Sequence, residues 1–392
     1  MDHENTSLEI ADIFRKYIHL YTKQNKLTTR QYYAVRDIIS CRTPVLGGHI
    51  KKCSYCNYEI IRYNSCRNRH CPKCSAVDKE KWIIKQESRL LPTHYFHLVF
   101  TVPQEFCKIG LFNKSAIYNI AFKASIETLK NFGKHTYNGK IGDTTILHTW
   151  SQTLIFHIHT HHIIPGGILS EKGKWISTKD NFLFPVKAME KMYKAIFIRE
   201  IRKLYKNNGL ELPGELSKYQ KKYNFNSMVD SVYQKKWIVY AKPPFKNVNY
   251  VIKYLARYTH RIAISNRRIK SISKGMINFS YRDNKDNNKT KLMVLPAYEF
   301  IRRYLNHILP KGFVKIRHYG FMSNSAQKSD FIKCAQHFNV SINKPTTNDI
   351  ENLLLRMGID TKLCPKCKNQ TLFIYKEIPK NNGPPFEYDK VA

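Results

Sequence analysis

Three histidines alternate along the segment FHIHTHHIIPGG in the middle of the chain. Its β-branched and aromatic residues are typical of a strand, on which His157, His159 and His161 would share one face and His162 would point to the other. Charged imidazoles so close together would repel one another, and neutral imidazoles that share a metal ion remove this conflict. Residues 144–170 contain no Asp or Glu. The pattern therefore predicts a metal that polarises a phosphate as a Lewis acid, with the nucleophile supplied from elsewhere.

Three tyrosines four residues apart are candidates for that nucleophile. Tyr250, Tyr254 and Tyr258 would lie on one face of a helix. The surrounding residues 231–282 contain twelve Lys or Arg and no Asp or Glu, so phenolate and phosphoryl charge would both be stabilised there. Tyrosines at helical spacing also line ordinary cores, and periodicity alone favours that alternative.

Two Cys-x2-Cys pairs in HIKKCSYCNYEIIRYNSCRNRHCPKC predict a structural zinc site of the zinc-ribbon kind. The predicted ligands are Cys53, Cys56, Cys71 and Cys74, with Cys66, His70 and His49 as further candidates for a Cys3His set or a second ion. Basic residues surround the module, so it either contacts DNA or only folds the N-terminus. A third pair, Cys364 and Cys367, either joins Cys334 and His337 or remains as free thiols.

The elements that must position these residues alternate between helix and strand. Apolar spacing predicts two helices in the first forty residues, with Thr28 or Thr29 as the cap between them. Further helices are predicted at 114–133, 186–206 and 247–260, and strands at 94–103, 150–167, 237–245, 276–282 and 291–296. No Gly-rich phosphate loop accompanies them, so the pattern favours an α+β fold over a Rossmann fold.

Composition indicates a polyanion as partner. The chain has 392 residues with 66 Lys and Arg against 29 Asp and Glu, a net charge of +37 spread along its length. We expect no membrane span and no secretory signal, hence a cytoplasmic protein whose ten cysteines are metal ligands or free thiols.

Three motifs in this order, SCRNRHCPKC, FHIHTHHIIPGG and YLARYTHRIAISNRR, resemble those of rolling-circle insertion-sequence transposases with an HUH (His-hydrophobic-His) nuclease domain. The likeness is closest to the insertion sequence ninety-one family and covers roughly residues 10–325. It implies a bacterial, nucleoid-associated enzyme with a central antiparallel sheet, flanking helices and an N-terminal helical and zinc-ribbon-like module. The implied domains are 1–90 (zinc-binding), 91–325 (catalytic) and 326–392 (a C-terminal region).

The resemblance also implies roles for residues. The HUH pair falls on His159 and His161, with Thr160 in place of the hydrophobic residue, so that a register using His157 and His159 stays open. A third metal ligand is expected, with Gln152 and His97 as candidates. The catalytic tyrosines match Tyr254 and Tyr258, one or both of them active, and the arginines of the motif that would contact DNA are Arg257, Arg261, Arg267 and Arg268.

The implied reaction uses Mg²⁺ or Mn²⁺ and single-stranded DNA at the ends of the element. It proceeds through a 5′-phosphotyrosine link and a free 3′-OH, with a homo-oligomer left open. The principal alternative is a non-catalytic, zinc-containing nucleic-acid-binding protein, which would leave the histidine strand unexplained.

Overall fold

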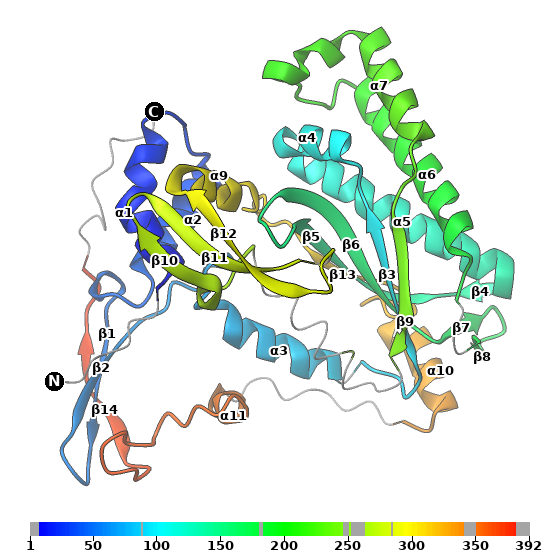
Figure 1. The fold of residues 1–392 in the computed structure, drawn as a ribbon. Helices are drawn as coiled ribbons and strands as arrows, with labels where there is room; N and C mark the ends of the chain where they lie inside the picture. Colours follow the sequence, from blue (N-terminus) through cyan, green and yellow to red (C-terminus); the bar gives the residue numbers. More distant parts are fainter. Residues whose placement is uncertain are drawn as a thin grey trace.

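The structure, a computed structural model, describes residues 8–87, 89–179, 183–245, 251, 263–283, 285–340 and 350–381. It combines helices with antiparallel sheets, which confirms the mixed α+β class predicted from the sequence (Figure 1). None of the described helices is both long enough and apolar enough to cross a membrane.

A five-stranded antiparallel sheet forms the centre of the molecule. Its strand order is β13-β5-β6-β3-β9, so that β6 lies in the middle. The strands are β3 (Tyr95–Thr101), β5 (Gly142–Trp150), β6 (Phe156–Pro165), β9 (Val239–Phe245) and β13 (Ile316–Gly320).

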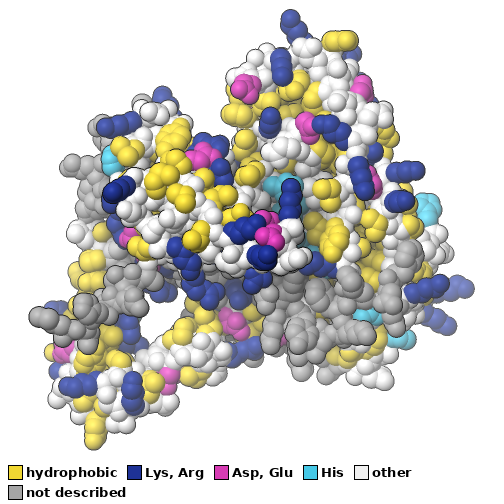
Figure 2. All heavy atoms as spheres, in the orientation of Figure 1, with side chains coloured by type: hydrophobic (Ala, Val, Ile, Leu, Met, Phe, Trp, Pro, Cys, Tyr) yellow, Lys and Arg dark blue, Asp and Glu magenta, His cyan; other side chains and the backbone are white. Residues whose placement is uncertain are grey.

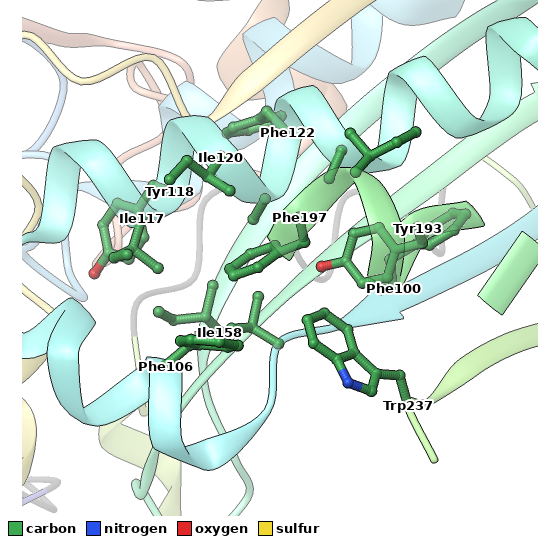
Figure 3. Packing of buried hydrophobic residues seen from close by; sticks show 14 of the residues in the cluster. Phe100, Phe106, Ile117, Tyr118, Ile120, Phe122, Ile158, Tyr193, Phe197 and Trp237 are labelled. Carbon is green, nitrogen blue, oxygen red and sulfur yellow. The ribbon is translucent and has the colours of Figure 1, made fainter. Parts of the chain in front are cut away.

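Helices cover one face of this sheet and build the main hydrophobic core with it. They are α4 (Gln104–Phe112), α5 (Lys114–Tyr137) and α6 (Val186–Lys206), and α7 (Lys222–Gln234) adds to the same core by packing on α6. Phe100 and Ile158 from the sheet pack with Phe197 of α6 and with Trp237, all of them buried (Figure 3). Apolar residues on alternate positions of β3 and β6 therefore fix which face of the sheet turns toward the helices.

A second core joins the N-terminal helices to a smaller sheet. α1 (Ile10–Thr22) packs on α2 (Thr29–Ser40) and on α9 (Ala297–Asn306), and this core includes residues of β10 (Ile269–Ser273), β11 (Met276–Asp283) and β12 (Lys289–Pro296). Thr28 caps α2, since its hydroxyl accepts a hydrogen bond from the backbone N–H of Gln31 while the Gln31 side chain bonds back. This confirms the predicted helix pair and the cap at Thr28.

Two further three-stranded sheets complete the described chain. One contains β4 (Gly139–Lys140), β7 (Gly167–Ser170) and β8 (Trp175–Ser177), close to α10 (Asp330–His337). The other joins both ends of the chain, because β14 (Leu372–Ile378) pairs with β1 (Gly48–Cys53), which pairs with β2 (Glu59–Tyr63) (Figure 1). α3 (Ser75–Glu87) and α11 (Ile350–Arg356) contact each other.

Candidate functional site

Three histidines meet on the face of the central sheet that lies opposite the main core. His159 and His161 come from β6, and His148 comes from β5, where it pairs directly with His159. Their candidate ligand nitrogens all lie within 4.8 Å of one another. Because β5 and β6 are adjacent, hydrogen-bonded strands, the backbone itself holds the three imidazoles together.

The imidazoles of His159 and His161 are held in the neutral form, which is the form that ligates metals. Burial lowers the pKa of His159 to about 3. Burial also lowers the pKa of His161 well below its ordinary value, and repulsion from the neighbouring His148 and His159 lowers it further. A set of three imidazole nitrogen donors without a carboxylate fits a divalent transition metal. The residues present therefore suit a metal ion.

A fourth histidine supports this group from the next strand. His97 of β3 lies with its Nε2 2.9 Å from Nδ1 of His161, and the two rings are nearly coplanar, at an interplanar angle of 5°. With Nδ1 engaged by His97, the Nε2 atom of His161 is the one that can bind a metal. Ligating histidines commonly use their second ring nitrogen in this way, which fixes the tautomer and the orientation of the ring.

The other face of β6 carries a separate, buried polar contact. His162 donates from Nδ1 to Oδ2 of Asp143 at 2.8 Å, and both side chains are fully buried. Thr145 also donates to that carboxylate, and Thr160 contacts Nε2 of His162. His162 thus points away from the metal group, as predicted.

The structure distributes the remaining predicted ligands differently. His157 is not one of the three grouped residues, although its ring centroid lies 5.2 Å from that of His159. The third histidine of the group is His148 and not the predicted candidate His97, while the other candidate, Gln152, lies in the loop between β5 and β6. His148 was not predicted as a ligand from the sequence.

Four cysteines form a second group below the N-terminal helices. Cys41 follows α2, Cys66 lies in a loop, and Cys71 and Cys74 immediately precede α3, with all four candidate sulfurs within 4.8 Å of one another. The Sγ–Sγ distances from Cys74 are 3.5 Å to Cys41 and 3.6 Å to Cys66. Hydrogen bonds with Cys66, and to a smaller extent with Cys71, lower the pKa of Cys41 to about 7. A lower pKa favours the thiolate, which is the form that binds zinc.

His70 is not a ligand of this group. Its Nε2 accepts a hydrogen bond from the backbone N–H of Leu309, and its Nδ1 contacts the Asn68 side chain. Burial lowers the pKa of His70 to about 3, so that the neutral ring links the cysteine module to the chain near α9.

The predicted single zinc ribbon is wrong in its pairing. Cys53 and Cys56 do not meet Cys71 and Cys74 but lie with two cysteines from the other end of the chain, Cys364 and Cys367. The alternative that Cys334 and His337 complete the Cys364–Cys367 pair is also wrong. Cys334 is buried in an apolar cluster with Phe331, and His337 stacks on Trp175.

The predicted tyrosines and two of the predicted arginines lie outside the described residues. These are Tyr250, Tyr254, Tyr258, Arg257 and Arg261.

Three described residues flank this gap. Val251 is buried with Ile146 and Ile163, which share the sheet face of His159 and His161. Arg267 is exposed, whereas Arg268 donates to the backbone carbonyls of Gln152 and Ser280 and so ties the β5–β6 loop to β11.

The surface around the site is strongly basic. Figure 2 shows Lys and Arg side chains over both lobes of the molecule and histidine side chains at the base of the hollow between them. A surface that carries so many Lys and Arg side chains suits an anionic polymer such as nucleic acid.

The chain thus combines a strongly basic composition with three groups of candidate metal ligands, and comparison with known proteins identifies its family. The model described as "Transposase zinc-binding domain" matches residues 13–102, and the model described as "Putative transposase" matches residues 142–330. The chain is 34% identical over 390 residues to "Putative transposase y4qJ" of Sinorhizobium fredii, covering 97% of this chain and 98% of that protein. It is 25% identical over 296 residues to "Transposase for insertion sequence element IS801" of Pseudomonas savastanoi pv. phaseolicola, covering 74% and 70%.

The chain therefore belongs to the transposases of the insertion sequence ninety-one (IS91) family. This confirms the resemblance drawn from the three motifs, and it makes DNA the substrate and zinc a bound ion of the N-terminal region.

Proposed function

We propose that this transposase cuts and rejoins single-stranded DNA on the sheet face that holds His148, His159 and His161. The observation that carries the proposal is the convergence of three imidazoles, without a carboxylate, on neighbouring strands in the middle of an antiparallel sheet. Such a site suits the polarisation of a phosphate.

An HUH nuclease fold is the architecture we assign to the central sheet. Its support is that the histidine pair lies on the middle strand of five antiparallel strands, with helices packed on the opposite face. In this assignment His159 and His161 are the HUH pair and His148 is the third ligand. The division into 1–90, 91–325 and 326–392 stays a prediction, and the two matched family regions lie mainly within its first two parts.

Tyr254 or Tyr258 is the proposed nucleophile. Support comes from Val251, three residues before Tyr254, which packs against Ile146 and Ile163 on the histidine face.

In the proposed reaction the phenol oxygen attacks phosphorus and its proton passes to solvent. The bond from phosphorus to the 3′ oxygen breaks, and this oxygen takes up a proton to leave a free 3′-OH and a 5′-phosphotyrosine. A divalent metal held by the three histidines would draw charge from the phosphate. Attack of a 3′-OH on the phosphotyrosine reverses these bond changes, so that strands are joined without ATP.

Formation of a covalent adduct tests the proposal. Labelled single-stranded oligonucleotides that span the ends of the element are incubated with the full-length protein, and products are separated on a denaturing gel. We expect an adduct with the wild type, its loss in the variant with both Tyr254→Phe and Tyr258→Phe, and its retention in Tyr223→Phe. Tyr223 is a matched control because it is 83% exposed on α7.

The choice of metal is part of the same test. Nitrogen donors suit Mn²⁺ better than Mg²⁺, which prefers oxygen ligands, so we expect more adduct with Mn²⁺. An adduct that persists in the double tyrosine variant would contradict the assignment of the nucleophile. Tight DNA binding without any adduct would favour a non-catalytic zinc-containing DNA-binding protein.

A further inference from the structure

Cys53 and Cys56, from the N-terminal part of the chain, lie together with Cys364 and Cys367, from its C-terminal part, in an arrangement that has the form of a zinc ribbon built from two halves. The first half is the β1–β2 hairpin, whose turn contains Cys53 and Cys56. The second half contains Cys364 and Cys367 and continues into β14, which pairs with β1 in antiparallel register from Gly48–Ile378 to Cys53–Leu372. More than three hundred residues separate the two halves along the chain, whereas a zinc ribbon is ordinarily formed by one short, continuous segment.

The two cysteine turns have the same backbone conformation. In the first, Cys53 N–H donates to Tyr58 O and Asn57 N–H donates to Cys53 O. In the second, Cys364 N–H donates to the carbonyl of residue 369, and the N–H of residue 368 donates to Cys364 O.

The residue after the second cysteine of each turn is left-handed. Asn57 has φ 55° and Lys368 has φ 63°. Lys rarely adopts this conformation without a constraint from its surroundings, so the repeated geometry points to a common structural requirement in both turns.

The sulfur positions fit a tetrahedral ion. All four candidate sulfurs lie within 4.8 Å of one another, with Sγ–Sγ distances of 3.6 Å for Cys53–Cys367 and 3.7 Å for Cys56–Cys364. A tetrahedron with Zn–S bonds of about 2.3 Å has edges of about 3.8 Å. The distances are far above the roughly 2.05 Å of a disulfide, so the four cysteines are not two oxidised pairs.

Packing alone gives β14 little to hold it in place. Its only fully buried side chain is Leu372, and five consecutive residues from Phe373 to Glu377 are exposed. The apolar cluster under the ribbon contains only Cys53, Cys364 and Leu372 as buried members. So small a core does not offset the conformational entropy of two ordered segments, which is the situation in which structural metals replace a core.

We propose that Cys53, Cys56, Cys364 and Cys367 bind a second structural zinc ion, which fastens the C-terminal segment to the N-terminal hairpin. The first zinc ion belongs to Cys41, Cys66, Cys71 and Cys74. The matched zinc-binding region ends at residue 102, so it does not include the two C-terminal ligands. The proposal is independent of the DNA-cleavage mechanism.

Zinc stoichiometry and X-ray absorption of the full-length wild-type protein test the proposal first. We expect two zinc ions per chain in an all-sulfur environment. A single all-sulfur zinc would overturn the proposal, as would iron in the second position. Zinc bound by the histidine group would add nitrogen scattering and is thereby distinguished from both cysteine sites.

Matched variants then assign the second ion to its ligands. The double variant Cys364→Ser/Cys367→Ser should contain one zinc fewer than the wild type, and so should Cys53→Ser/Cys56→Ser. Cys334→Ser should keep the wild-type content, because this thiol lies in an apolar cluster outside both groups. An unchanged zinc content in the C-terminal double variant would contradict the assignment.

Hydrogen exchange separates loss of the ion from loss of the fold. In Cys364→Ser/Cys367→Ser the amides of β14 should lose protection while those of β5 and β6 keep it. Unaltered protection of β14 would show that zinc does not hold this strand.

Discussion

Replacing His97 by alanine should weaken metal binding at the histidine group without removing a ligand. His97 Nε2 lies 2.9 Å from His161 Nδ1, and burial lowers the pKa of His97 to about 3, so that it is a neutral acceptor. When His161 binds a metal through Nε2, its proton must reside on Nδ1 and is donated to His97. Without His97, this buried N–H loses its partner in the metal-bound form.

The magnitude follows from that lost hydrogen bond. A buried donor left without its partner costs about 1–3 kcal/mol, and loss of a residue that orients a metal ligand weakens metal affinity by about 10- to 100-fold. Because each factor of ten corresponds to about 1.4 kcal/mol, the two estimates agree. We therefore expect the Mn²⁺ dissociation constant to rise by about 10- to 100-fold in His97→Ala.

Calorimetric titration with Mn²⁺, together with the Mn²⁺ dependence of adduct formation, measures this effect. The midpoint should move to higher Mn²⁺ in His97→Ala, with the plateau at saturating metal largely kept. His97→Gln should recover part of the affinity, because an amide oxygen can accept from Nδ1. His318→Ala is the matched control, since this imidazole lies on the same face but bonds Thr144.

Two outcomes would refute the reasoning. An unchanged Mn²⁺ midpoint in His97→Ala would show that the His97–His161 contact does not support the ligand. If the plateau of adduct formation at saturating Mn²⁺ is lost while the Mn²⁺ midpoint is unchanged, His97 acts in substrate binding or folding instead.

Three further predictions concern the ligand set, a buried lysine and the main core. His148→Ala should abolish high-affinity Mn²⁺ binding, whereas His157→Ala should keep it, and the reverse result would restore the register predicted as the alternative. Burial lowers the pKa of Lys315 from 10.5 to about 7. The charged amine therefore destabilises the folded state fully below pH 7, and this destabilisation decreases as the pH rises toward 10.5, the pKa of the unfolded chain. Lys315→Met should therefore raise the free energy of unfolding by a few kcal/mol at pH 6 and by less at pH 9 in urea denaturation, and a pH-independent gain would contradict this. Phe197→Ala, in the aromatic core of α6, should lower the free energy of unfolding by about 3–5 kcal/mol, and a loss below about 1 kcal/mol would show that the site repacks.

Local periodicity was sufficient to find the N-terminal helix pair and several of the longer elements. The helix predicted at 186–206 is α6 with the same bounds, and the strands predicted at 94–103 and 237–245 contain β3 and β9. These segments have one buried face or a continuous apolar run, which is the property that periodicity measures.

His148 escaped prediction because its strand was not recognised. β5 has the sequence GDTTILHTW, and all its residues except the last are buried, so it shows no alternation of polar and apolar positions. The segment predicted as one strand from residue 150 begins at the last residue of β5 and continues through a loop, and β6 starts only at Phe156. A ligand that strand pairing brings next to the others can be predicted only when the pairing register of the two strands is known.

The cysteine pairing failed for a different reason. Spacing along the chain correctly indicated Cys-x2-Cys turns, but it favoured the nearest turn as partner for Cys53 and Cys56. The structure selects a turn more than three hundred residues away, because β14 pairs with β1 and carries Cys364 and Cys367 to the hairpin. Nothing in the spacing distinguishes a near partner from a distant one.

The register of β6 is the feature on which the metal group depends. Both faces of this strand carry histidine, so hydrophobic alternation alone would tolerate a shift of one residue in its pairing register. Such a slip would turn His162 toward the metal group, and it would turn His159 and His161 toward the helices. The structure makes such a slip costly, because it would remove the hydrogen bond from buried His162 to buried Asp143 and leave both polar groups without their partners. A contact on the far face of the sheet thus selects the face on which the ligands appear, although it touches none of them.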